Sequence, residues 1–515
     1  MTDSKSVVAI DVGTSGTRTA VVNTKDGAIL AQTHQEYPSF FPHPAWVEQD
    51  AEDWWHTTCN TAKATLANSA VDIESIVAVS ITNQRETIVP VDSQGQPLHR
   101  AIVWQDRRTI PQCDSILSLL GAEIVYRETG LTVDPYFSCP KLLWLKEHQP
   151  QVFRQTEKFV LVHDFIFHRL SAQFATDYSN ASRTMLFSIE NHRWSDLMCN
   201  RLEIPQDKLP TPFPSGTAVG HITPEAAEAT HLPEGMPVVV GGGDQQCGAV
   251  GVGVVQPGRV KATIGTGTFI LAFENQPVFD PQRRLLCSCH AVPEKWVVEA
   301  SIFTSGIIYR WFRDQFAQEE KQLAKLLNAE AYMLMDQQAQ QSPPGARGVL
   351  LLPHFVGAGA PHWNPNARGV IVGLALGHTR ADILRAIMEG TAFEVRRNLN
   401  IMRELNIPIQ ELRLTGGATR SALWNQIQAD ITQVKVLRSQ IEEATALGAA
   451  ILAAVGGGVY PDVERAVEHM VAVEAPILPS KACEALYEKL FALHTEVYQA
   501  LEKAKVFARL STVEQ

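Results

Sequence analysis

The chain has 515 residues, of which 45% are apolar and 19% charged, and its formal net charge is −11. This length exceeds one ordinary hydrophobic core, so two large domains are expected, and the composition is that of a folded protein. The acidic balance argues against a nucleic-acid-binding protein, because phosphate backbones select basic surfaces, but it is compatible with a nucleotide held by backbone N–H groups and a metal ion.

The sequence shows no feature of a secreted or membrane-spanning protein. The first residues lack a basic segment followed by an apolar core, so we expect a cytoplasmic location. The stretch 444–456 is rich in Ala and Gly and predicts a packed helix rather than a membrane span. Among eight scattered cysteines only Cys287 and Cys289 are close together, without the second ligand pair of a zinc site, so reduced thiols are expected.

The first predicted elements are two strands around a turn of small residues. Residues 7–10 are apolar, residues 11–18 (DVGTSGTR) form the turn, and residues 19–22 favour a strand again. Glycine and small hydroxyl residues leave backbone N–H groups accessible to phosphate oxygens, and Asp11 would suit the shell of a Mg²⁺ ion. An ordinary hairpin turn with a capping Asp is the alternative, and the motif is not a Walker A loop.

A dense polar segment follows the next predicted strand. After an amphipathic stretch over 53–66, the apolar run 76–81 leads into Asn83-Gln84-Arg85-Glu86-Thr87. Adjacent Arg and Glu side chains can donate and accept hydrogen bonds to neighbouring hydroxyls of a polyol, although a surface ion pair is the alternative. Trp104 follows closely and would cover a carbon backbone, although core packing is the alternative for a single Trp.

An acidic residue follows a further apolar strand near the middle of the chain. Asp244 comes after the strand 238–240 and three glycines. Transfer of a phosphoryl group to an alcohol needs a carboxylate within hydrogen-bond reach of the attacking hydroxyl, and Asp244 is a candidate. A helix-capping Asp is the alternative.

The second half of the chain repeats the opening pattern. Residues 260–264 lead into the turn 265–268 and a second strand over 269–273, which suggests a duplicated α/β domain, with chance similarity as the alternative. A third glycine-rich turn, 415–418, joins a predicted strand to a helix over 421–431, where an adenine or ribose can lie against backbone. Residues 381–388 show helical spacing, and the segment from 481 onward favours a closing helix.

Together these motifs resemble the FGGY family of carbohydrate kinases, and within it the chain is most similar to the glycerol kinases. The resemblance runs from about residue 7 to about residue 460, and its most specific stretches are ITNQRET (81–87), AIVWQDRRT (101–109), DPYFS (134–138), TDYSNASRTMLF (176–187), GDQQ (243–246) and GTGTF (265–269). It implies an α/β fold of two actin-like (RNase-H-like) ATPase domains facing each other across a cleft. The expected segments are an N-terminal domain over 5–250, a C-terminal domain over 251–475 and a helical tail over 476–515.

The resemblance also implies roles for individual residues. Asp244 would be the catalytic base, and Asp11 together with Asp244 would hold Mg²⁺. The polyol would be bound by Arg85, Glu86, Trp104, Tyr136, Asp244, Gln245 and Phe269. From the turns and the resemblance together, the nucleotide would be bound by Gly13, Thr14, Ser15, Thr17, Arg18, Gly265, Thr266, Gly267, Gly306, Arg310, Gly416, Gly417 and Ser421.

The sequence departs from the glycerol kinase pattern at several positions. Arg310 stands where glycerol kinases usually have Gln, and Ser421 where they usually have Asn, so the adenine contacts differ. Residues 218–241 lack the Gly-rich, Arg-bearing loop that binds fructose 1,6-bisphosphate in some bacterial glycerol kinases. This segment and residues 141–147 are more like the xylulokinase branch.

The activity that the resemblance implies is ATP-dependent phosphorylation of a small polyol, with glycerol converted to glycerol 3-phosphate and with ATP and Mg²⁺ as cofactors. We expect neither a nucleic-acid nor a membrane partner, and we expect a homo-oligomer (dimer or tetramer). One alternative is a pentulose kinase of the same family, against which the Arg85–Glu86 pair argues. The other is a non-catalytic actin-like nucleotide-binding protein, against which the retained Asp11 and Asp244 argue.

Overall fold

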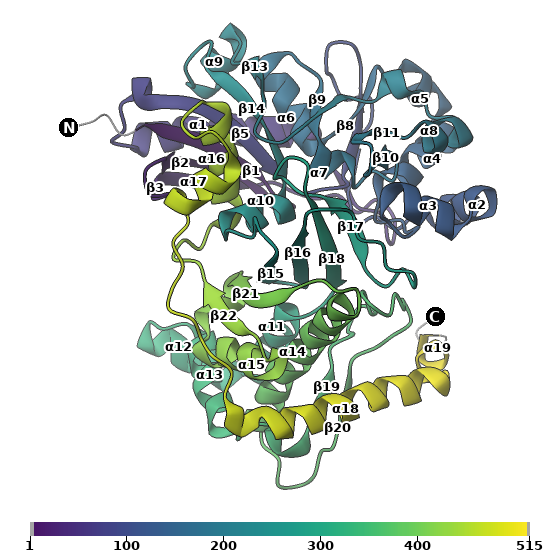
Figure 1. Ribbon diagram of the computed structural model, residues 1–515, viewed down its shortest axis with the longest axis vertical. Helices are drawn as coiled ribbons and strands as arrows, with labels where there is room; N and C mark the ends of the chain where they lie inside the picture. The colour runs from purple at the N-terminus through teal and green to yellow at the C-terminus, as the bar shows by residue number, and fades with distance from the viewer. Residues whose placement is uncertain (1–4, 512–515) are drawn as a thin grey trace. The chain divides into compact units, whose positions relative to one another are not determined.

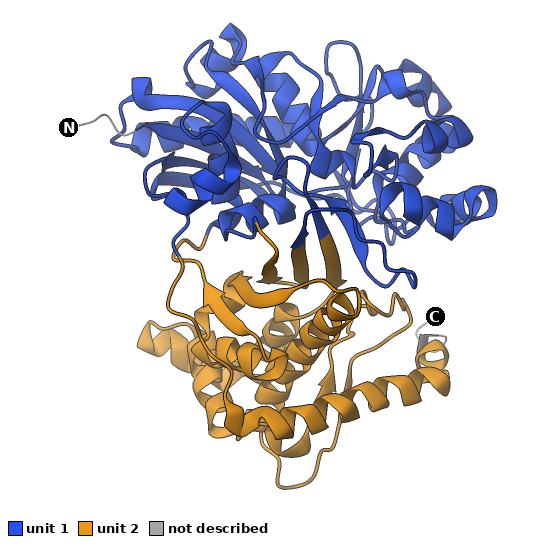
Figure 2. Ribbon diagram, in the orientation of Figure 1, with its two compact units in different colours: residues 1–255, 273–297, 443–472 blue, residues 256–272, 298–442, 473–515 orange. Residues whose placement is uncertain are grey.

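The computed structural model describes residues 5–511 and divides them into two compact units (Figures 1 and 2). Unit 1 contains the described residues up to 255 together with 273–297 and 443–472. Unit 2 contains 256–272, 298–442 and the described residues from 473 onward. These spatial units interleave along the chain, so they are a different division from the sequence segments 5–250, 251–475 and 476–515, which stay a prediction. The last residues of the predicted tail, 512–515, lie outside the described residues.

The core of unit 1 is a six-stranded mixed sheet of order β13-β14-β5-β1-β2-β3. β1 pairs antiparallel with β2 and parallel with β5, which in turn pairs parallel with β14. The bounds are β1 Ser6–Val12, β2 Gly16–Asn23, β3 Ile29–Glu36, β5 Ile76–Asn83, β13 Ala218–His221 and β14 Pro237–Gly243. The predicted first hairpin and the strands over 76–81 and 238–240 are therefore confirmed.

The remaining strands of unit 1 are short. A four-stranded sheet has the order β4-β7-β6-β8, and β9 pairs with β12 and β10 with β11. Their bounds are β4 Glu48–Gln49, β6 Ile88–Val91, β7 Ala101–Ile102, β8 Lys158–Leu161, β9 Ala175–Asp177, β10 Phe187–Ser188, β11 Arg193–Trp194, β12 Thr211–Phe213 and β17 Leu286–Cys289. The helices are α1 Ala51–Asn68, α2 Ile110–Leu120, α3 Ala122–Thr129, α4 Ser138–His148, α5 Pro150–Gln155, α6 Val162–Ser171, α7 Tyr178–Ala181, α8 Asp196–Leu202, α9 Pro224–Thr230, α10 Asp244–Gly251, α16 Ala444–Gly456 and α17 Val463–Met470.

Helices cover both faces of the main sheet in unit 1. Alternate residues of β1, such as Val8 and Ile10, join a core that includes residues of α1 and α6. α16 packs on β1, β5 and β14 and crosses α10 closely. The crossing depends on glycine, because a Cβ on Gly448 would lie 1.8 Å from the carbonyl oxygen of Cys247. The prediction of a packed helix over 444–456 is therefore confirmed.

Unit 2 repeats the strand order of unit 1. Its main sheet belongs to the strand order β17-β18-β16-β15-β21-β22, in which the five strands from β18 to β22 follow the same sequence of connections as β3-β2-β1-β5-β14. β15 pairs antiparallel with β16 and parallel with β21, and β21 pairs parallel with β22. The bounds are β15 Gly258–Ile264, β16 Thr268–Glu274, β18 Trp296–Ile302, β21 Ile409–Thr415 and β22 Lys435–Arg438, with the separate pair β19 Leu350–Leu352 and β20 Val370–Val372. The predicted duplication of an α/β domain is confirmed by this order.

The longest helix of unit 2 has a well-defined start. The side chains of Thr379 and Asp382 form a capping box at the N-terminus of α14, and most of the residues of this helix are buried. The helices of unit 2 are α11 Gly306–Phe316, α12 Gln318–Leu327, α13 Ala331–Gln341, α14 Arg380–Glu404, α15 Ala422–Thr432, α18 Lys481–Lys503 and α19 Val506–Ser511. The predicted helices over 381–388 and 421–431 and the helical character of the segment from 481 are confirmed.

Two further expectations can be compared with the structure. Within residues 5–511 none of the helices combines the length and the apolar character that crossing a membrane requires. All eight cysteines are free thiols, as expected, and Cys287 and Cys289 are buried.

Candidate active site

The ends of three neighbouring strands place the predicted catalytic and substrate residues of unit 1 together. β1, β5 and β14 are parallel neighbours, so their carboxyl ends lie at one edge of the sheet. Asp11 lies near the end of β1, Arg85 and Glu86 follow β5, and Asp244 follows β14 as the first residue of α10. The topology therefore brings together residues that are more than 200 positions apart in the sequence.

The Arg85 side chain is buried and lies beside two carboxylates. Its Nε is 3.5 Å from Oδ1 of Asp244 and 3.8 Å from Oε1 of Glu86, and its Nη1 donates a 3.0 Å hydrogen bond to Oε1 of Gln246. The Arg85 side chain can occupy this position because residue 243 is a glycine: a Cβ there would lie 2.5 Å from Cδ of Arg85. Arg85 therefore lies beside both Glu86, its partner in the predicted polyol-binding pair, and Asp244, the predicted base.

Glu86 is held from two sides by groups that are distant in sequence. Arg183 donates from Nε to Oε1 of Glu86 at 2.6 Å, and Ser138 donates from its hydroxyl to the Glu86 carbonyl at 3.0 Å. Glu86 adopts a φ of 63°, in the left-handed region that few non-glycine residues occupy. Such backbone is found where surrounding contacts hold it and is concentrated at functional sites.

Two aromatic residues flank this cluster. The rings of Trp104 and Tyr136 meet edge to face with centroids 5.6 Å apart, and the Arg183 guanidinium lies 5.5 Å from the Tyr136 ring. Burial, followed by the negative charge of Glu86, raises the pKa of Tyr136. Tyr136 therefore keeps its hydroxyl proton at neutral pH and can donate a hydrogen bond.

The first of the two predicted phosphate-binding turns is tied to the same cluster. Trp104 donates from Nε1 to the Thr14 hydroxyl at 3.0 Å, and Gln49 donates from Nε2 to the Thr14 carbonyl at 2.7 Å. The turn is closed by a 3.0 Å hydrogen bond from the Gly13 N–H to the Gly16 carbonyl. These contacts place the loop around Thr14 next to the aromatic side of the site.

The other predicted residues of this turn differ in their surroundings. Ser15 is exposed, and Arg18 forms an ion pair with Glu443. Thr17, in contrast, is buried, and its hydroxyl is 2.7 Å from that of Thr57 in α1. The Thr17 side chain therefore packs on α1. The predicted nucleotide contact of Thr17 would have to be made by its backbone and not by its hydroxyl.

Asp11 and Asp244 are close enough to influence each other. Burial, and then the charge of Asp244, raises the pKa of Asp11 to about 7, while Arg18 acts in the opposite direction. Asp244 is held by its neighbour Gln245, whose backbone N–H donates to Oδ1 at 2.7 Å and whose Nε2 lies 3.4 Å from Oδ2. One third of the Asp244 side chain is exposed, so it is accessible to a substrate.

In unit 2 the second hairpin turn is fixed against the start of α11. The Gly306 N–H donates to the Gly265 carbonyl at 2.9 Å, and the Ser305 N–H donates to the Thr266 carbonyl at 2.9 Å. A Cβ on Gly306 would lie 2.4 Å from the Gly265 oxygen, and a Cβ on Gly267 would lie 2.5 Å from the Ile302 oxygen. These glycines are therefore required for the close approach of the two loops.

Six of the predicted nucleotide-binding residues line one pocket of unit 2. The pocket has a volume of about 540 Å³. The six residues are Gly265, Thr266, Gly306, Arg310, Gly417 and Ser421. Gly416 and Gly267 do not line the pocket and instead pack closely against neighbouring backbone. A Cβ on Gly416 would lie 2.6 Å from the Ile264 oxygen. Phe269 is half-buried on β16, and its predicted contact with the polyol stays a prediction.

Aromatic side chains form one wall of this pocket. Tyr309 stacks on Tyr332 with ring centroids 5.9 Å apart and meets Trp424 edge to face at 5.3 Å. Its hydroxyl donates to Oδ1 of Asp336 at 2.8 Å, and burial raises the pKa of Asp336 although hydrogen bonds from Ser421 and Tyr309 oppose this. A flat aromatic wall beside polar groups and glycine backbone suits a nucleoside.

Several residues of these sites did not emerge from the sequence. Arg183 lies in the TDYSNASRTMLF stretch on which the family resemblance rests, so a signal was present although no role was assigned. Gln49, Tyr332, Asp336 and Trp424 lie outside the quoted motifs, and only the structure brings them to the two sites.

Comparison with known proteins identifies the family. The model of the FGGY family of carbohydrate kinases, N-terminal domain, matches residues 6–251, and that of the C-terminal domain matches residues 260–457. A glycerol kinase from Albidiferax ferrireducens is 36% identical over 493 residues, covering 92% of this chain and 95% of the relative. A xylulose kinase from Bacillus subtilis is 32% identical over 494 residues, covering 96% and 97%.

A solved structure shows the same fold. The ligand-bound xylulose kinase from Lactobacillus acidophilus superposes with a TM-score of 0.89 at 24% identity, covering 97% of this chain and 98% of that one. The two-domain α/β fold is thus that of the sugar kinases with an actin-like ATPase architecture. The chain belongs to the FGGY family of carbohydrate kinases.

Proposed function

We propose that this carbohydrate kinase phosphorylates a terminal hydroxyl of a small polyol, with glycerol as the preferred substrate and glycerol 3-phosphate as the product. The observation that carries the proposal is the contact series Asp244–Arg85–Glu86–Arg183, in which every member is buried or half-buried. Adjacent donors and acceptors of this kind match the adjacent hydroxyls of a polyol. The Trp104–Tyr136 pair supplies an apolar surface for its carbons.

The mechanism follows from the position of Asp244. Its carboxylate accepts the proton of the terminal hydroxyl as that oxygen attacks the γ-phosphorus of ATP in line. Arg85, 3.5 Å from Oδ1, and Gln245 hold the carboxylate in place. Glu86 and Tyr136 orient the substrate, so that the correct hydroxyl faces the base. The backbone N–H groups of the threonine-glycine turns stabilise charge on the phosphoryl oxygens.

The residues present fit a magnesium ion near the phosphates. Asp11 and Asp244 are two carboxylates close enough that one raises the pKa of the other, and a bound divalent cation would relieve this repulsion. Mg²⁺ favours one or two carboxylates together with substrate phosphates and water. When bound, the ion neutralises charge on the phosphate oxygens. Asp11 is its principal protein ligand in this proposal.

The pocket of unit 2 is the proposed site of the adenosine. Gly417 and Gly306 present backbone without side chains, and Tyr309, Tyr332 and Trp424 supply flat apolar surface. Trp424 is 3% exposed, and its Nε1 has no hydrogen-bond partner within the part of the chain that the structure describes. A buried donor at the wall of a pocket gains from a ligand acceptor.

A pentulose kinase is the second candidate, and two observations favour it. The Bacillus subtilis relative named a xylulose kinase is nearly as similar as the glycerol kinases, and the segments 141–147 and 218–241 resemble the xylulokinase branch. Both candidates use the same base and nucleotide pocket. They differ in the number of hydroxyls that the Arg85–Glu86 region must bind.

The test is ADP production by purified protein with MgATP and matched concentrations of glycerol, D-xylulose, D-ribulose, erythritol or dihydroxyacetone. We expect glycerol to give the highest kcat/KM. Asp244→Asn should lower kcat at least ~100-fold, the lower end for loss of a general base, with Asp207→Asn at an exposed site as the unchanged control. A higher kcat/KM with a pentulose than with glycerol would identify the protein as a pentulose kinase. ATP hydrolysis that no substrate changes would favour the non-catalytic nucleotide-binding alternative.

A further inference from the structure

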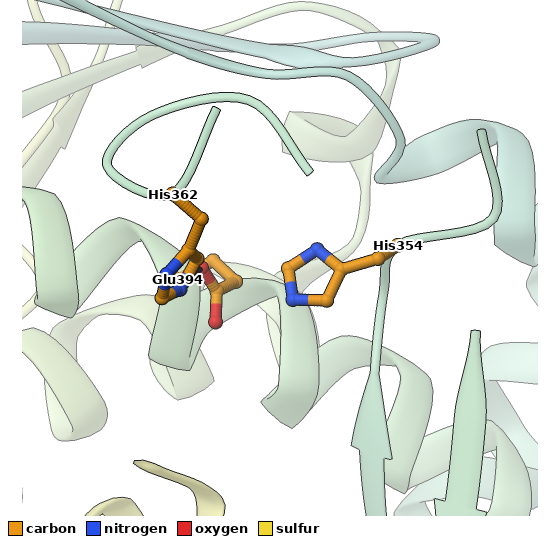
Figure 3. Close-up of side chains that lie close together, drawn as sticks. All are labelled: His354, His362 and Glu394. Atoms are coloured by element: carbon orange, nitrogen blue, oxygen red, sulfur yellow. Dashed lines mark ion pairs between the residues drawn. The ribbon is translucent and has the colours of Figure 1, made fainter. Parts of the chain in front are cut away.

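Three potential metal ligands lie together in unit 2, outside the nucleotide pocket (Figure 3). His354 follows β19, His362 lies in the segment between β19 and β20, and Glu394 lies on α14. One ligand atom of each lies within 4.8 Å of the others. Nε2 of His362 is 4.0 Å from Oε2 of Glu394, and the two imidazole rings have centroids 5.8 Å apart.

The two imidazoles carry unused polar atoms. Nε2 of His354 and Nε2 of His362 are buried, and neither has a hydrogen-bond partner among residues 5–511. His354 is only 3% exposed. A buried polar atom left without a partner destabilises the folded protein, so two of them beside one carboxylate need an explanation. A bound cation would satisfy both at once.

Arg397 and His494 both approach the same oxygen of the Glu394 carboxylate. Arg397 Nε is 3.3 Å from Oε1 of Glu394, and Nδ1 of His494 is 3.7 Å from the same oxygen. The second ring nitrogen of His494 is already bonded to the Leu351 carbonyl at 3.0 Å. Oε2, by contrast, is the oxygen nearest to His362.

The protonation states are those that metal binding requires. Burial alone would raise the pKa of Glu394, but Arg397 and the three histidines outweigh it and lower that pKa to about 2. Burial lowers the pKa of His362 to about 4 and also lowers that of His354. At neutral pH the carboxyl group is therefore ionised and both imidazoles keep free lone pairs, as metal ligands must.

We propose that His354, His362 and Glu394 bind a divalent transition-metal ion, with Zn²⁺ as the first choice, in a structural site of unit 2. Imidazole together with carboxylate favours Zn²⁺, whereas Mg²⁺ prefers oxygen ligands alone, so this site is separate from the cation of phosphoryl transfer. Zn–ligand bonds of ~2.0–2.2 Å place tetrahedral ligand atoms ~3.4 Å apart. The three side chains would move inward by less than ~1 Å each, and water would complete the coordination.

The site would fix a segment that also supports the nucleotide loop. The Ala360 N–H donates to the Ser301 carbonyl at 2.9 Å, and the Thr304 hydroxyl donates to the Pro353 carbonyl. Residues 301–304 directly precede Ser305 and Gly306. An ion that joins residues 354 and 362 to α14 would therefore stabilise unit 2, whichever substrate the enzyme phosphorylates.

A neutral histidine cluster without metal is the competing explanation. The His362 ring stacks on Tyr498 with centroids 3.7 Å apart and rings inclined by 25°, and the His354 ring meets Tyr498 at 5.2 Å. In this explanation the two histidines serve only to pack against Tyr498 and bind no metal ion. The two explanations differ in whether Zn²⁺ binds, so metal titration distinguishes them.

The experiment uses full-length protein without a histidine tag, stripped with a chelator and titrated with ZnCl₂ in the presence of Mg²⁺. Calorimetry and thermal denaturation are measured for the wild type, His354→Gln, His362→Gln and the exposed control His221→Gln. We expect one Zn²⁺ per chain and, at free Zn²⁺ of ~100 times Kd, a ~100-fold rise in the ratio of folded to unfolded protein. Each ligand variant should weaken binding at least ~10-fold, and His221→Gln should leave it unchanged.

A wild type that binds no Zn²⁺, or ligand variants that both bind Zn²⁺ as tightly as the wild type, would overturn the proposal. Circular dichroism checks that the variants fold. If they do not, anomalous scattering at the zinc edge from wild-type crystals gives the answer directly. A peak among His354, His362 and Glu394 supports the site, and zinc bound only elsewhere contradicts it.

Discussion

Arg183 donates a 2.6 Å hydrogen bond from Nε to Oε1 of Glu86, and both side chains are buried. The same guanidinium donates from Nη1 to the hydroxyl of Ser288 at 3.1 Å. Removing one partner of a buried ion pair is costly because the remaining charge has no compensation, typically ~3–5 kcal/mol. The orientation of Glu86, a proposed polyol ligand, therefore depends on a residue 97 positions further along the chain.

Arg183→Met should raise the KM for the polyol by at least ~10-fold, equivalent to ~1.4 kcal/mol of lost binding, while the KM for ATP stays within a factor of ~2. It should also lower the free energy of unfolding, because Glu86 keeps a buried charge. Initial-rate kinetics and urea denaturation measure the two effects. Arg154→Met, at an exposed position of α5, is the control. An unchanged polyol KM in Arg183→Met would show that Glu86 does not contact the substrate.

Lys141 positions the loop that carries Tyr136. Its buried Nζ donates to the carbonyl oxygens of Pro135, Tyr136 and Phe137 at 2.9, 2.7 and 2.9 Å. Lys141→Met removes all three bonds, so we expect a higher polyol KM with little change in the KM for ATP. Lys146→Met, on the same helix but with a partly exposed side chain, is the matched control. Equal polyol KM values in the two variants would contradict the positioning role.

The strands and turns were predictable because their signals are local. Short apolar runs that end in Gly and small hydroxyl residues specify strand and turn within a few positions, as at residues 7–18 and 260–268. The repetition of that pattern predicted the duplicated domain, and the strand order of the two sheets confirms it. The stretches that predicted the family are equally local.

The contacts between distant segments were not predictable in the same way. Whether the Thr17 hydroxyl faces a phosphate or α1 depends on the side of the strand that each residue occupies and on where α1 packs. The Trp104–Thr14 hydrogen bond spans 90 positions, and no periodicity indicates it. The aromatic wall of Tyr309, Tyr332 and Trp424 likewise joins three helices or their ends, and arises only from tertiary packing.

Two adjacent glycines allow the fold and the nucleotide contact to be tested separately. Gly416 has a φ of 93°, and a Cβ there would lie 2.6 Å from the Ile264 oxygen, so Gly416→Ala should lower the melting temperature. A Cβ on Gly417 meets nothing within 4 Å and projects from the lining of the pocket. Gly417→Ala should therefore keep the melting temperature and raise the KM for ATP. An unchanged KM for ATP would place the adenosine elsewhere.

Asp382 should make the stability of unit 2 depend on pH in the acid range. Burial alone would raise its pKa, but hydrogen bonds from Arg347, Thr379 and Ser342 outweigh burial and hold the pKa well below the ordinary value. The bonds from Arg347 are 2.9 and 2.8 Å long, and the carboxylate caps α14. A lowered pKa in the folded state means that the unfolded state binds the proton first. The stabilisation is therefore complete above the unfolded pKa of ~3.9 and is lost as the pH falls below it.

Asp382→Asn is the variant that isolates this effect. It should melt at a lower temperature than the wild type at pH 7, and the difference should shrink as the pH falls from 5 toward 3, because the Asp382 carboxyl group of the unfolded wild type then binds a proton while the folded one stays ionised. Asp114→Asn, at an exposed position of α2, should show no such convergence. Scanning calorimetry across this range measures both. A difference between the wild type and Asp382→Asn that stays constant down to pH 3 would mean that the side chain acts through its shape and hydrogen bonds and not through its charge.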